Sequence, residues 1–443
     1  MQRSIILHGA AVLTPAGPQP HWGLCIKDGR IAQLGPWQDL KPGPQDEYLD
    51  CKNQIILPGF INGHTHMYGV LSHGISTDAV VEEFNGFLED FWWPHVENRI
   101  SRELAELTAE WACVEMIESG TTAFFDILEA PLSLPGALES EALAVQKAGL
   151  RATLTFEACE RVSAENAALG LEENAAFIRA HKADALIGGA MSIHTLFTCG
   201  HGYVLRAREM ARQLGTKFHM HLSESVAEPD WCLAHLGKRP VETYAEWGVL
   251  DADVLASQLV QLNEAEIALY AKSGAGAVSM PLSNCEVGGG VAPVPALLRA
   301  GVQVGLGSDG YINSFFEVMR GAFLIHKAHL QNPQVMDAKT VFTMATAMGA
   351  KALGNAQIGA LAPGMQADVI TIRTDDTPTP VNLKNIYDQV VLFRNPGDVE
   401  HVFVQGRPLK LNGRLQTLDK AAIRERLREQ SAQFWEVRPQ SGG

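Results

Sequence analysis

The chain has 443 residues, 46% hydrophobic and 19% charged, a composition typical of a globular protein with a large buried core. Its 35 basic and 50 acidic side chains give a formal net charge of −15, which argues against nucleic acid or an anionic membrane as a partner. No apolar run is long enough for a signal peptide or for the roughly 18 residues of a membrane span. Seven cysteines without a C-x-x-C pair are typical of reduced thiols, so we expect a cytoplasmic protein whose cysteines are mostly buried.

Both ends of the chain have the pattern of short β-strands. The N-terminal part contains three such runs, over residues 4–13, 23–27 and 30–34. The C-terminal part contains three more, over residues 368–373, 399–405 and 408–411. Asp28-Gly29 between two of the runs is a strong hairpin signal. We therefore predict a small β-sandwich domain built from both chain termini, residues 1–57 and 359–443, with a charged C-terminal helix over 419–436.

Between these ends, residues 58–358 alternate helical and strand patterns. Helical runs are followed by β-prone runs, most clearly 102–119 with 122–127, 137–148 with 151–156, 171–181 with 187–193, and 204–214 with 217–222. The first, second and fourth of these helical runs stop at a glycine. Repeated helix–Gly–strand units predict a parallel sheet with right-handed crossovers. The β-prone runs number about eight, so the fold class we predict is α/β, a (β/α)8 TIM-like barrel with its chemistry at the C-terminal ends of the strands.

Two histidines stand at the start of this barrel, in the stretch Pro-Gly-Phe-Ile-Asn-Gly-His-Thr-His that ends with His64 and His66. Residues two apart on a strand face the same side, so both imidazoles can reach one point. Imidazole is the commonest neutral metal ligand and suits zinc or iron. The alternative is that an H-x-H pair arose by chance among 15 histidines.

Two later strands end in residues that would complete a metal site. One carries His221 and is followed by Glu224, and the last is followed by Asp309. Three imidazoles and one carboxylate suit a single divalent metal with an open position for water, whose pKa the metal lowers from about 15.7 toward 7. Glu224 is placed to take and return the proton. His219 stays open as the ligand in place of His221, and Glu224 and Asp309 could instead be ordinary loop and turn residues.

Four segments together resemble the amidohydrolase superfamily, in particular its deaminase and triazine-hydrolase branch. They are the His-Thr-His stretch at 58–66, His-Met-His-Leu-Ser-Glu at 219–224, Ser-Asn at 283–284 and Gly-Leu-Gly-Ser-Asp-Gly at 305–310. The likeness runs essentially from end to end. Within that branch, Phe91-Trp92-Trp93, the segment 309–326 and Thr377-Pro378-Thr379-Pro380 are similar to the SsnA-type aminohydrolases.

The resemblance implies a barrel inserted into a β-sandwich, one zinc or iron ion per subunit, and hydrolysis of a C–N bond. It implies that the metal ligands are His64, His66, His221 and Asp309, with Glu224 as the proton shuttle. The segment around residue 194 has no lysine that could be carbamylated to bridge two metals, which favours one metal per chain.

Substrate-facing positions are less clear from the resemblance. His194 matches a histidine that contacts substrate. At two other positions the chain departs from related deaminases, with Gln258 in place of a polarising strand-six histidine and Met280 in place of a strand-seven histidine. We expect Gln258 to take part in catalysis by neutral hydrogen bonding, and Met280 and the nearby Asn284 to contact the substrate. These changes leave the substrate and the reaction open.

The segment 84–93 follows the first barrel strand and is rich in aromatic residues, including Trp92 and Trp93. One interpretation is a helix that packs on the barrel rim. The other is an aromatic lid over a flat heterocycle, in which stacking contributes about 1 kcal/mol beyond burial.

We predict a metal-dependent aminohydrolase that cleaves a C–N bond of an amino-substituted N-heterocycle, with metal-bound hydroxide as nucleophile. The second hypothesis keeps the site but makes the protein a cyclic amide hydrolase, or a hydrolase that removes halide or alkylamine from a triazine. The third is a catalytically silent binding homologue. We expect one divalent metal per subunit, Zn²⁺ or alternatively Fe²⁺, a small heterocyclic substrate, no nucleic acid or membrane partner, and a homodimer or higher homo-oligomer.

Overall fold

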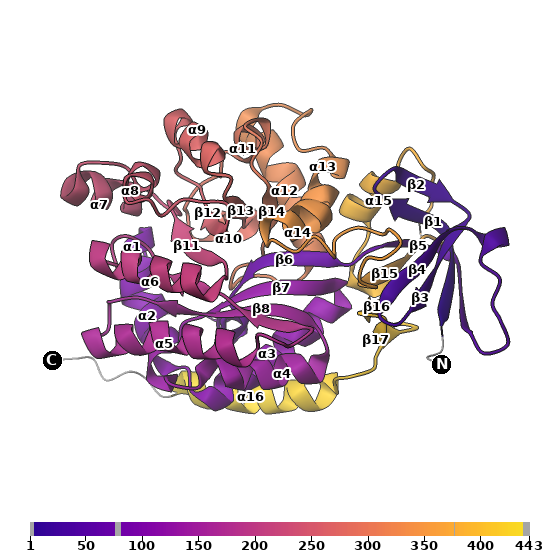
Figure 1. Ribbon diagram of the computed structural model, residues 1–443, viewed down its shortest axis with the longest axis horizontal. Coiled ribbons are helices and arrows are strands. Elements are labelled where there is room, and N and C mark those ends of the chain that lie inside the picture. The colour runs from indigo at the N-terminus through magenta and orange to yellow at the C-terminus, as the bar shows by residue number, and fades with distance from the viewer. Residues whose placement is uncertain (1–3, 76–80, 376, 437–443) are drawn as a thin grey trace.

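A computed structural model describes residues 4–75, 81–375 and 377–436 (Figure 1). One of its two sheets is entirely parallel and closes on itself, because β10 pairs with both β11 and β8. Its strands are β6 (Phe60–Thr65), β7 (Thr121–Leu128), β8 (Arg151–Ala158), β9 (Ile187–Gly189) with β10 (Met191–Ile193), β11 (Phe218–Leu222), β12 (Val254–Gln258), β13 (Gly276–Ser279) and β14 (Val304–Leu306). The predicted (β/α)8 barrel is confirmed.

The second sheet joins the two ends of the chain, as predicted. Its strands are β1 (Ile5–Thr14), β2 (Gly17–Pro20), β3 (Trp22–Lys27), β4 (Arg30–Pro36), β5 (Glu47–Pro58), β15 (Val369–Arg373), β16 (Val399–Val404), β17 (Arg407–Leu411) and β18 (Arg414–Leu415). All pairs are antiparallel except β1 with β5. Alternate apolar side chains such as Leu7, Ile56 and Phe403 form its own buried cluster. The proposed domain boundaries after residues 57 and 358 stay a prediction.

The small sheet runs directly into the barrel, since only Gly59 separates β5 from β6. A Cβ at Gly59 would lie 2.0 Å from the Thr122 hydroxyl oxygen, so this close crossing requires glycine. Backbone hydrogen bonds from Gly59 to Asp368 and from Phe60 to Gly120 fix the start of β6 on both sides. The position of the His64–His66 pair is therefore set by both sheets.

Helices surround the barrel, and α16 at the end of the chain packs on α3 (Figure 1). The α-helices that follow the first barrel segments are α3 (Arg102–Glu118), α4 (Ala137–Ala148), α5 (Ala164–Ala180), α6 (His201–Leu214), α7 (Ala227–Leu236), α8 (Pro240–Glu246), α9 (Glu264–Ser273), α10 (Pro281–Glu286), α11 (Val294–Arg299), α12 (Phe315–Leu330), α13 (Ala338–Thr343), α14 (Gly349–Ala352), α15 (Ile386–Phe393) and α16 (Lys420–Glu436). Helix α4 ends at Gly149 and α6 at Gly215, both in the left-handed conformation that glycine adopts at low cost.

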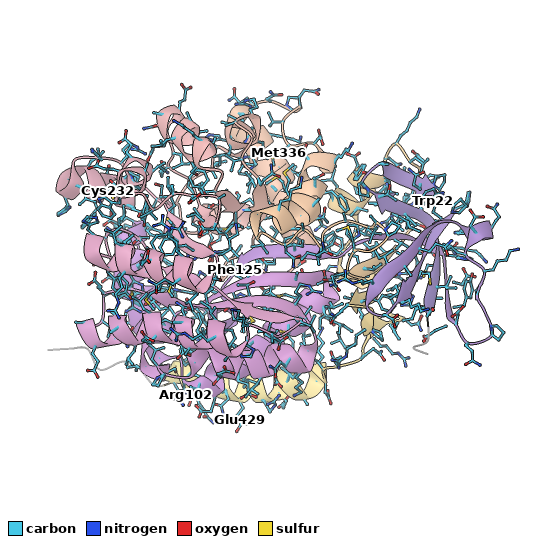
Figure 2. All side chains as sticks on the ribbon, viewed as in Figure 1. Trp22, Arg102, Phe125, Cys232, Met336 and Glu429 are labelled. Carbon is cyan, nitrogen blue, oxygen red and sulfur yellow. The ribbon has the colours of Figure 1, made fainter. Side chains whose placement is uncertain are left out.

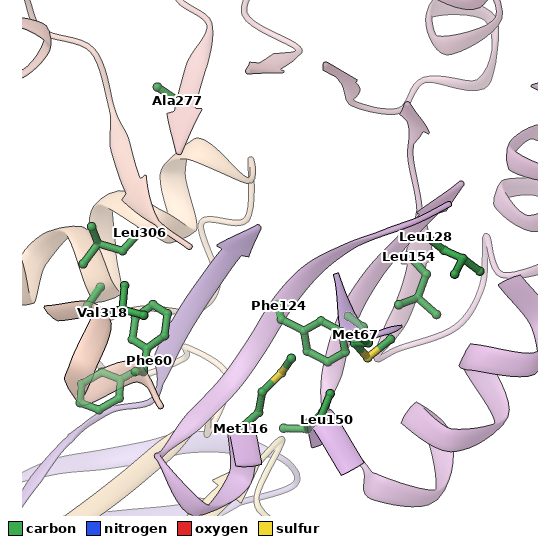
Figure 3. Close-up of a cluster of buried hydrophobic side chains, with 14 of the residues drawn as sticks. Phe60, Met67, Met116, Phe124, Leu128, Leu150, Leu154, Ala277, Leu306 and Val318 are labelled. Atoms are coloured by element: carbon green, nitrogen blue, oxygen red, sulfur yellow. The ribbon is translucent and has the colours of Figure 1, made fainter. Parts of the chain in front are cut away.

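The main core lies between the sheet and this helical layer. In Figure 3, Phe124 of β7 points toward Met116 of α3 and Leu150, and all three are almost fully buried. A second cluster joins strands across the barrel interior and includes Phe125, labelled in Figure 2, with Leu255 and Val278. These contacts bury apolar surface at roughly 25 cal/mol per Å² and hold the strand ends in fixed register.

Local differences from the predicted elements have identifiable causes. The predicted strand 187–193 is two strands, because β9 pairs only with β8 while β10 pairs with both β8 and β11. Helix α5 begins at Ala164, seven residues before the predicted start at 171, because the Ser163 side chain caps it by accepting from Asn166 N. Five of the seven cysteines are buried and all are free, including Cys232 on α7 (Figure 2). In the described ranges no helix is long and apolar enough to cross a membrane.

Candidate metal centre and active site

Three histidines from two strands converge at the C-terminal end of the barrel. His64 and His66 lie on or directly after β6, and His221 lies on β11. Each offers a ring nitrogen, and the three nitrogens lie within 4.8 Å of one another. Nε2 of His64 and Nε2 of His66 are only 3.2 Å apart. Two imidazole lone pairs at that distance repel each other unless a proton or a cation lies between them, which fits a metal site.

Asp309, directly beyond β14, adds a carboxylate to this cluster. Its Oδ1 lies 3.2 Å from Nε2 of His66 and 3.8 Å from Nε2 of His64. Although burial opposes ionisation, the hydrogen bond and charge of His66 and the charge of His64 hold the pKa of Asp309 well below its usual range. Three imidazoles and an ionised carboxylate make a donor set that fits one divalent cation.

Hydrogen bonds from outside the cluster orient the ligand rings. His66 Nδ1 is 2.6 Å from the carbonyl oxygen of Ile127, so the proton belongs on Nδ1 and Nε2 is free to bind metal. His219, the alternative ligand to His221, has Nδ1 2.8 Å from the Ser192 hydroxyl and Nε2 3.2 Å from the Ser257 hydroxyl. Both of its ring nitrogens are occupied, which favours His221.

The strand ends around the cluster have unusual backbone conformations. Ser223, Gln258, Leu259 and Asp309 all have positive φ, between 52° and 78°. Such conformations cost non-glycine residues about 1–3 kcal/mol each, and they cluster where surrounding structure holds functional side chains in place. Gly307 precedes Asp309 at a point where a Cβ would lie 2.7 Å from the His64 carbonyl oxygen. Close backbone approach therefore links the β14 tip to the β6 tip.

Glu224 lies three residues beyond His221 and lines the cavity above the cluster. Burial, reinforced by the charge of Asp309, raises the pKa of Glu224 to about 8, with His221 acting in the opposite direction. The glycine loop 288–290 packs against its backbone, since a Cβ at Gly289 would lie 2.5 Å from the Glu224 carbonyl oxygen. The carboxyl group is thus desolvated and close to the ligands, as a group that exchanges protons requires.

Gln258 contacts Asp309 and lines the cavity. Its Nε2 donates to Asp309 Oδ2 at 2.8 Å, and the Ser283 hydroxyl donates to the same oxygen at 3.0 Å. The Asn284 amide in turn donates to Oε1 of Gln258. Both donors therefore occupy Oδ2 and leave Oδ1 directed at the histidines. Asn284 reaches the site through Gln258 and is not among the described residues that line the cavity.

Met280 is placed differently from our expectation of a substrate contact. Its side chain is fully buried in the core cluster with Phe125, Leu255 and Val278. Among described residues it is not part of the cavity lining. The residue directly follows β13 and stands at the N-cap of α10, and its side chain packs within this core cluster. We therefore assign Met280 a packing role.

The cavity has a volume of about 750 Å³ and is closed on one side by the aromatic segment. Helical turns α1 (Phe84–Gly86), η3 (Phe87–Trp92) and α2 (Trp93–His95) form this segment, and η3 is π-helical, a rare form that often occurs at functional sites. Both Trp92 and Trp93 line the cavity, and the Trp93 ring lies edge-on to His194 with centroids 6.1 Å apart. His194 is fixed by a 2.8 Å contact between Nδ1 and the Thr198 hydroxyl.

Sequence reasoning missed several buried acidic residues beside the site. Glu157 at the end of β8 has Oε1 2.9 Å from Nδ1 of His221 and 3.7 Å from Nε2 of His194. Burial opposes its ionisation, but His221 and His194 hold its pKa below the usual range. Glu157, His194 and His221 also form a second group of possible ligands. The signal available in the sequence was the position of Glu157, a carboxylate at the tip of a predicted barrel strand.

Arg161 was also missed and organises the wall behind Trp93. Its guanidinium pairs with Glu97 at 3.0 Å and with Glu129, and it lies over the Trp93 ring with 4.9 Å to the centroid. The Tyr68 hydroxyl donates to Glu97 at 2.9 Å. Nothing in the local sequence pattern indicates this network, because its members follow three different strands.

A closed parallel barrel with a cluster of histidines and a carboxylate at its C-terminal end is the arrangement expected of a barrel-type metal-dependent hydrolase. A model of the amidohydrolase family matches residues 55–409, and the chain belongs to that family. It is 35% identical over 396 residues to a 5-methylthioadenosine/S-adenosylhomocysteine deaminase of Thermococcus sibiricus, covering 87% of this chain and 89% of that protein. It is 32% identical to a 5′-deoxyadenosine deaminase of Methanothermobacter thermautotrophicus, covering 95% and 96%.

Solved structures share the fold. An adenosine deaminase from Xanthomonas campestris with bound zinc superposes with a TM-score of 0.90 at 24% identity, covering 98% of this chain and 99% of that one. An atrazine chlorohydrolase from Arthrobacter aurescens complexed with zinc gives 0.83 at 19% identity, covering 97% and 99%. The expected amidohydrolase superfamily is confirmed, with deaminases among the relatives. The protein is an enzyme that hydrolyses C–N bonds other than peptide bonds.

Proposed function

We propose that this protein is a metal-dependent deaminase that removes ammonia from an amino-substituted N-heterocycle of the adenosine type. The observation that carries the proposal is the convergence of His64, His66, His221 and Asp309 beneath a cavity into which Glu224 projects. The relatives add support, because the two described above are named as deaminases of adenosine derivatives.

The proposed cofactor is one divalent metal per chain, Zn²⁺ first and Fe²⁺ second. Three imidazoles and one carboxylate are a donor set that zinc accepts readily. When bound, such a cation acidifies water and so supplies a nucleophile at neutral pH. Gln258 and Ser283 hold Asp309 so that one carboxylate oxygen faces the histidines. The cytoplasmic location and the homodimer stay predictions.

Glu224 is the proposed proton carrier. A buried carboxyl group takes a proton from the attacking water and returns it to the leaving amine, which departs as ammonia. His194 lines the cavity beside His221, with ring centroids 5.5 Å apart, and is proposed to hydrogen-bond the heterocycle while its Nδ1 contacts the Thr198 hydroxyl. Trp92 and Trp93 are proposed to stack on the ring. The bond broken is the exocyclic C–N bond, and the bond formed is C–O.

The test is ammonia release from a panel of amino-heterocycles by protein of known metal content. The panel includes adenosine, 5′-methylthioadenosine, 5′-deoxyadenosine, amino-pterins, amino-pyrimidines and amino-triazines. We expect ammonia from at least one purine nucleoside, at one metal per chain. Release of chloride or alkylamine from a triazine, or opening of a cyclic amide, would instead support the second hypothesis. A chain that retains no metal and releases nothing would be the silent homologue.

A further inference from the structure

Carboxylates dominate the charged lining of the cavity above the metal centre. They come from both the floor and the mouth: Glu82, Glu83, Glu97, Glu157, Glu224, Glu286 and Asp309. The described lining residues include no lysine or arginine. Burial raises the pKa of Glu97 and of Glu224, so the negative charge that an entering substrate meets comes mainly from the exposed Glu82, Glu83 and Glu286 at the mouth.

The nearest guanidinium, that of Arg161, is already engaged. It pairs with Glu97 and Glu129, donates to the Asn98 side-chain oxygen at 2.8 Å, and lies behind the Trp93 ring. Only 9% of its side chain is exposed. Arg161 supports the aromatic wall and has no free donor face to offer an anionic substituent.

The outer cavity combines these charges with aromatic surface. Glu82 and Glu83 precede the aromatic segment, which we call the lid. Glu286 is the last residue of α10, which also contributes to the cavity lining, and all three side chains are exposed. Within the described ranges none of the three has an ion-pair partner. Between them the Phe87 and Trp92 rings stack with centroids 5.5 Å apart. This surface accepts an apolar or cationic group and repels an anion.

We infer that the site selects amino-heterocycles whose substituent remote from the amine is uncharged or cationic, and that it excludes those bearing phosphate or carboxylate. The inference rests on the proposed function and narrows its substrate class. It separates the activities named for the two relatives, because S-adenosylhomocysteine carries a carboxylate and 5′-deoxyadenosine does not. The chain's net charge of −15 acts in the same direction at long range.

The test uses four adenosines that differ only at the 5′ position. They are 5′-deoxyadenosine, the bulkier neutral 5′-methylthioadenosine, the cation 5′-amino-5′-deoxyadenosine and the dianion adenosine 5′-phosphate. We expect kcat/KM for the phosphate to be lower than for both neutral compounds by about tenfold or more, with the cation at least as good as 5′-deoxyadenosine. Added salt should reduce the difference in kcat/KM between the phosphate and the neutral compounds. A phosphate as good as the neutral pair overturns the inference.

Charge reversal at the mouth sharpens the test. Glu286→Lys should lower the ratio of kcat/KM for 5′-deoxyadenosine to kcat/KM for adenosine 5′-phosphate by about fivefold, because it replaces a charge that repels the phosphate with one that attracts it. Glu172→Lys is the matched control, with the same change in net charge on an exposed position of α5 outside the cavity. Equal effects of the two variants would mean that net charge, and not the cavity, sets the selectivity.

A second readout needs no turnover, so failure of the proposed function is distinguishable from failure of this inference. Trp93 lines the cavity, and the fluorescence lost in Trp93→Phe isolates its signal. Relative to free indole, iodide should quench that signal less than neutral acrylamide does, and Glu286→Lys should raise iodide quenching alone. If none of the four adenosines is deaminated, the proposed substrate class is wrong. The iodide quenching experiment then tests on its own whether the cavity excludes anions. Equal access of iodide and acrylamide in the unmodified protein would refute anion exclusion.

Discussion

His64, His221 and Asp309 stand at the ends of three parallel strands, whereas Trp92 and Trp93 stand on helical turns outside the sheet. The strand-tip residues are almost fully buried, and backbone hydrogen bonds such as those from Ser308 and Asp309 to the His64 carbonyl lock their spacing. Among the described residues, side chains make the contacts that join the aromatic lid (residues 84–93) to the end of the chain. Phe91 stacks on Trp435 of α16 with centroids 6.4 Å apart, and Trp435 donates to the Leu71 carbonyl.

The comparison teaches where a substitution acts. At a strand tip several backbone hydrogen bonds fix each residue, so a substitution removes one chemical group and leaves the neighbouring residues in place. In the lid, several partly exposed rings share the contact with the substrate, so each loss is partial. We therefore expect substitutions at the strand tips to abolish activity and substitutions in the lid to reduce it only partly.

The largest effect is expected from removing a ligand. His221→Ala and Asp309→Ala should each lose most of the bound metal and all measurable turnover, because the remaining donors no longer complete the coordination. His219→Asn is the matched control on the same strand, since His219 bonds only to two serine hydroxyls. Metal content by mass spectrometry checks both. Stoichiometric metal in the alanine variants would mean that the site lies elsewhere.

Glu224→Gln should separate binding from chemistry. The substitution keeps shape and removes the proton carrier, so metal content and substrate binding should persist while kcat falls by roughly 10² or more. Single-turnover kinetics with metal-loaded protein measures the chemical step directly. Near-normal turnover would remove Glu224 from the reaction and point to Glu157 as the group that exchanges protons.

The strand-tip side was also the side that the sequence predicted. His64, His66 and Asp309 follow from period-two spacing and from the rule that parallel strands present their C-terminal ends together, whereas the choice of His221 over His219 rested on the family resemblance. Gln258 was located but not understood, because its partner Asp309 is 51 residues away and the hydrogen bond between them depends on a left-handed backbone at both. No sequence pattern indicated the role of Arg161, because Glu97 and Glu129 contact it only through tertiary packing.

An intermediate effect is expected at Gln258, a strand-tip residue that acts on a ligand. Gln258→Ala removes one donor from Asp309 Oδ2 and leaves Asn284 without its acceptor, which should cost about 1–3 kcal/mol in kcat/KM. Gln258→Glu keeps the shape but places a second carboxylate against Asp309, so it should be more damaging than alanine. Metal affinity measured by competition with a chelator checks the pair. Equal metal affinity in all three proteins would limit Gln258 to a substrate role.

Smaller effects are expected in the lid. Trp93→Leu should raise KM by a few-fold with kcat nearly unchanged, in line with about 0.5–1.5 kcal/mol for one aromatic contact. Trp93→Phe should recover most of the loss, because a ring remains between Arg161 and His194. A collapse of kcat in Trp93→Phe would show that the lid positions His194 and does more than stack.

The smallest effect is expected at Met280, which tests whether strand-tip position alone confers importance. The residue stands one position beyond β13, yet its side chain belongs to the dry cluster with Phe125 and Val278. Met280→Leu conserves volume and should change the free energy of unfolding by less than about 1.5 kcal/mol and leave kcat/KM unaltered. Met280→His restores the residue type found in related deaminases, but here it buries an imidazole that lacks a hydrogen-bond partner, which costs about 1–3 kcal/mol of stability. Urea denaturation together with steady-state kinetics measures both quantities. If Met280→His gained activity without losing stability, the side chain at this position would reach the cavity. Residue 280 would then belong to the active site and not to the core cluster beneath it.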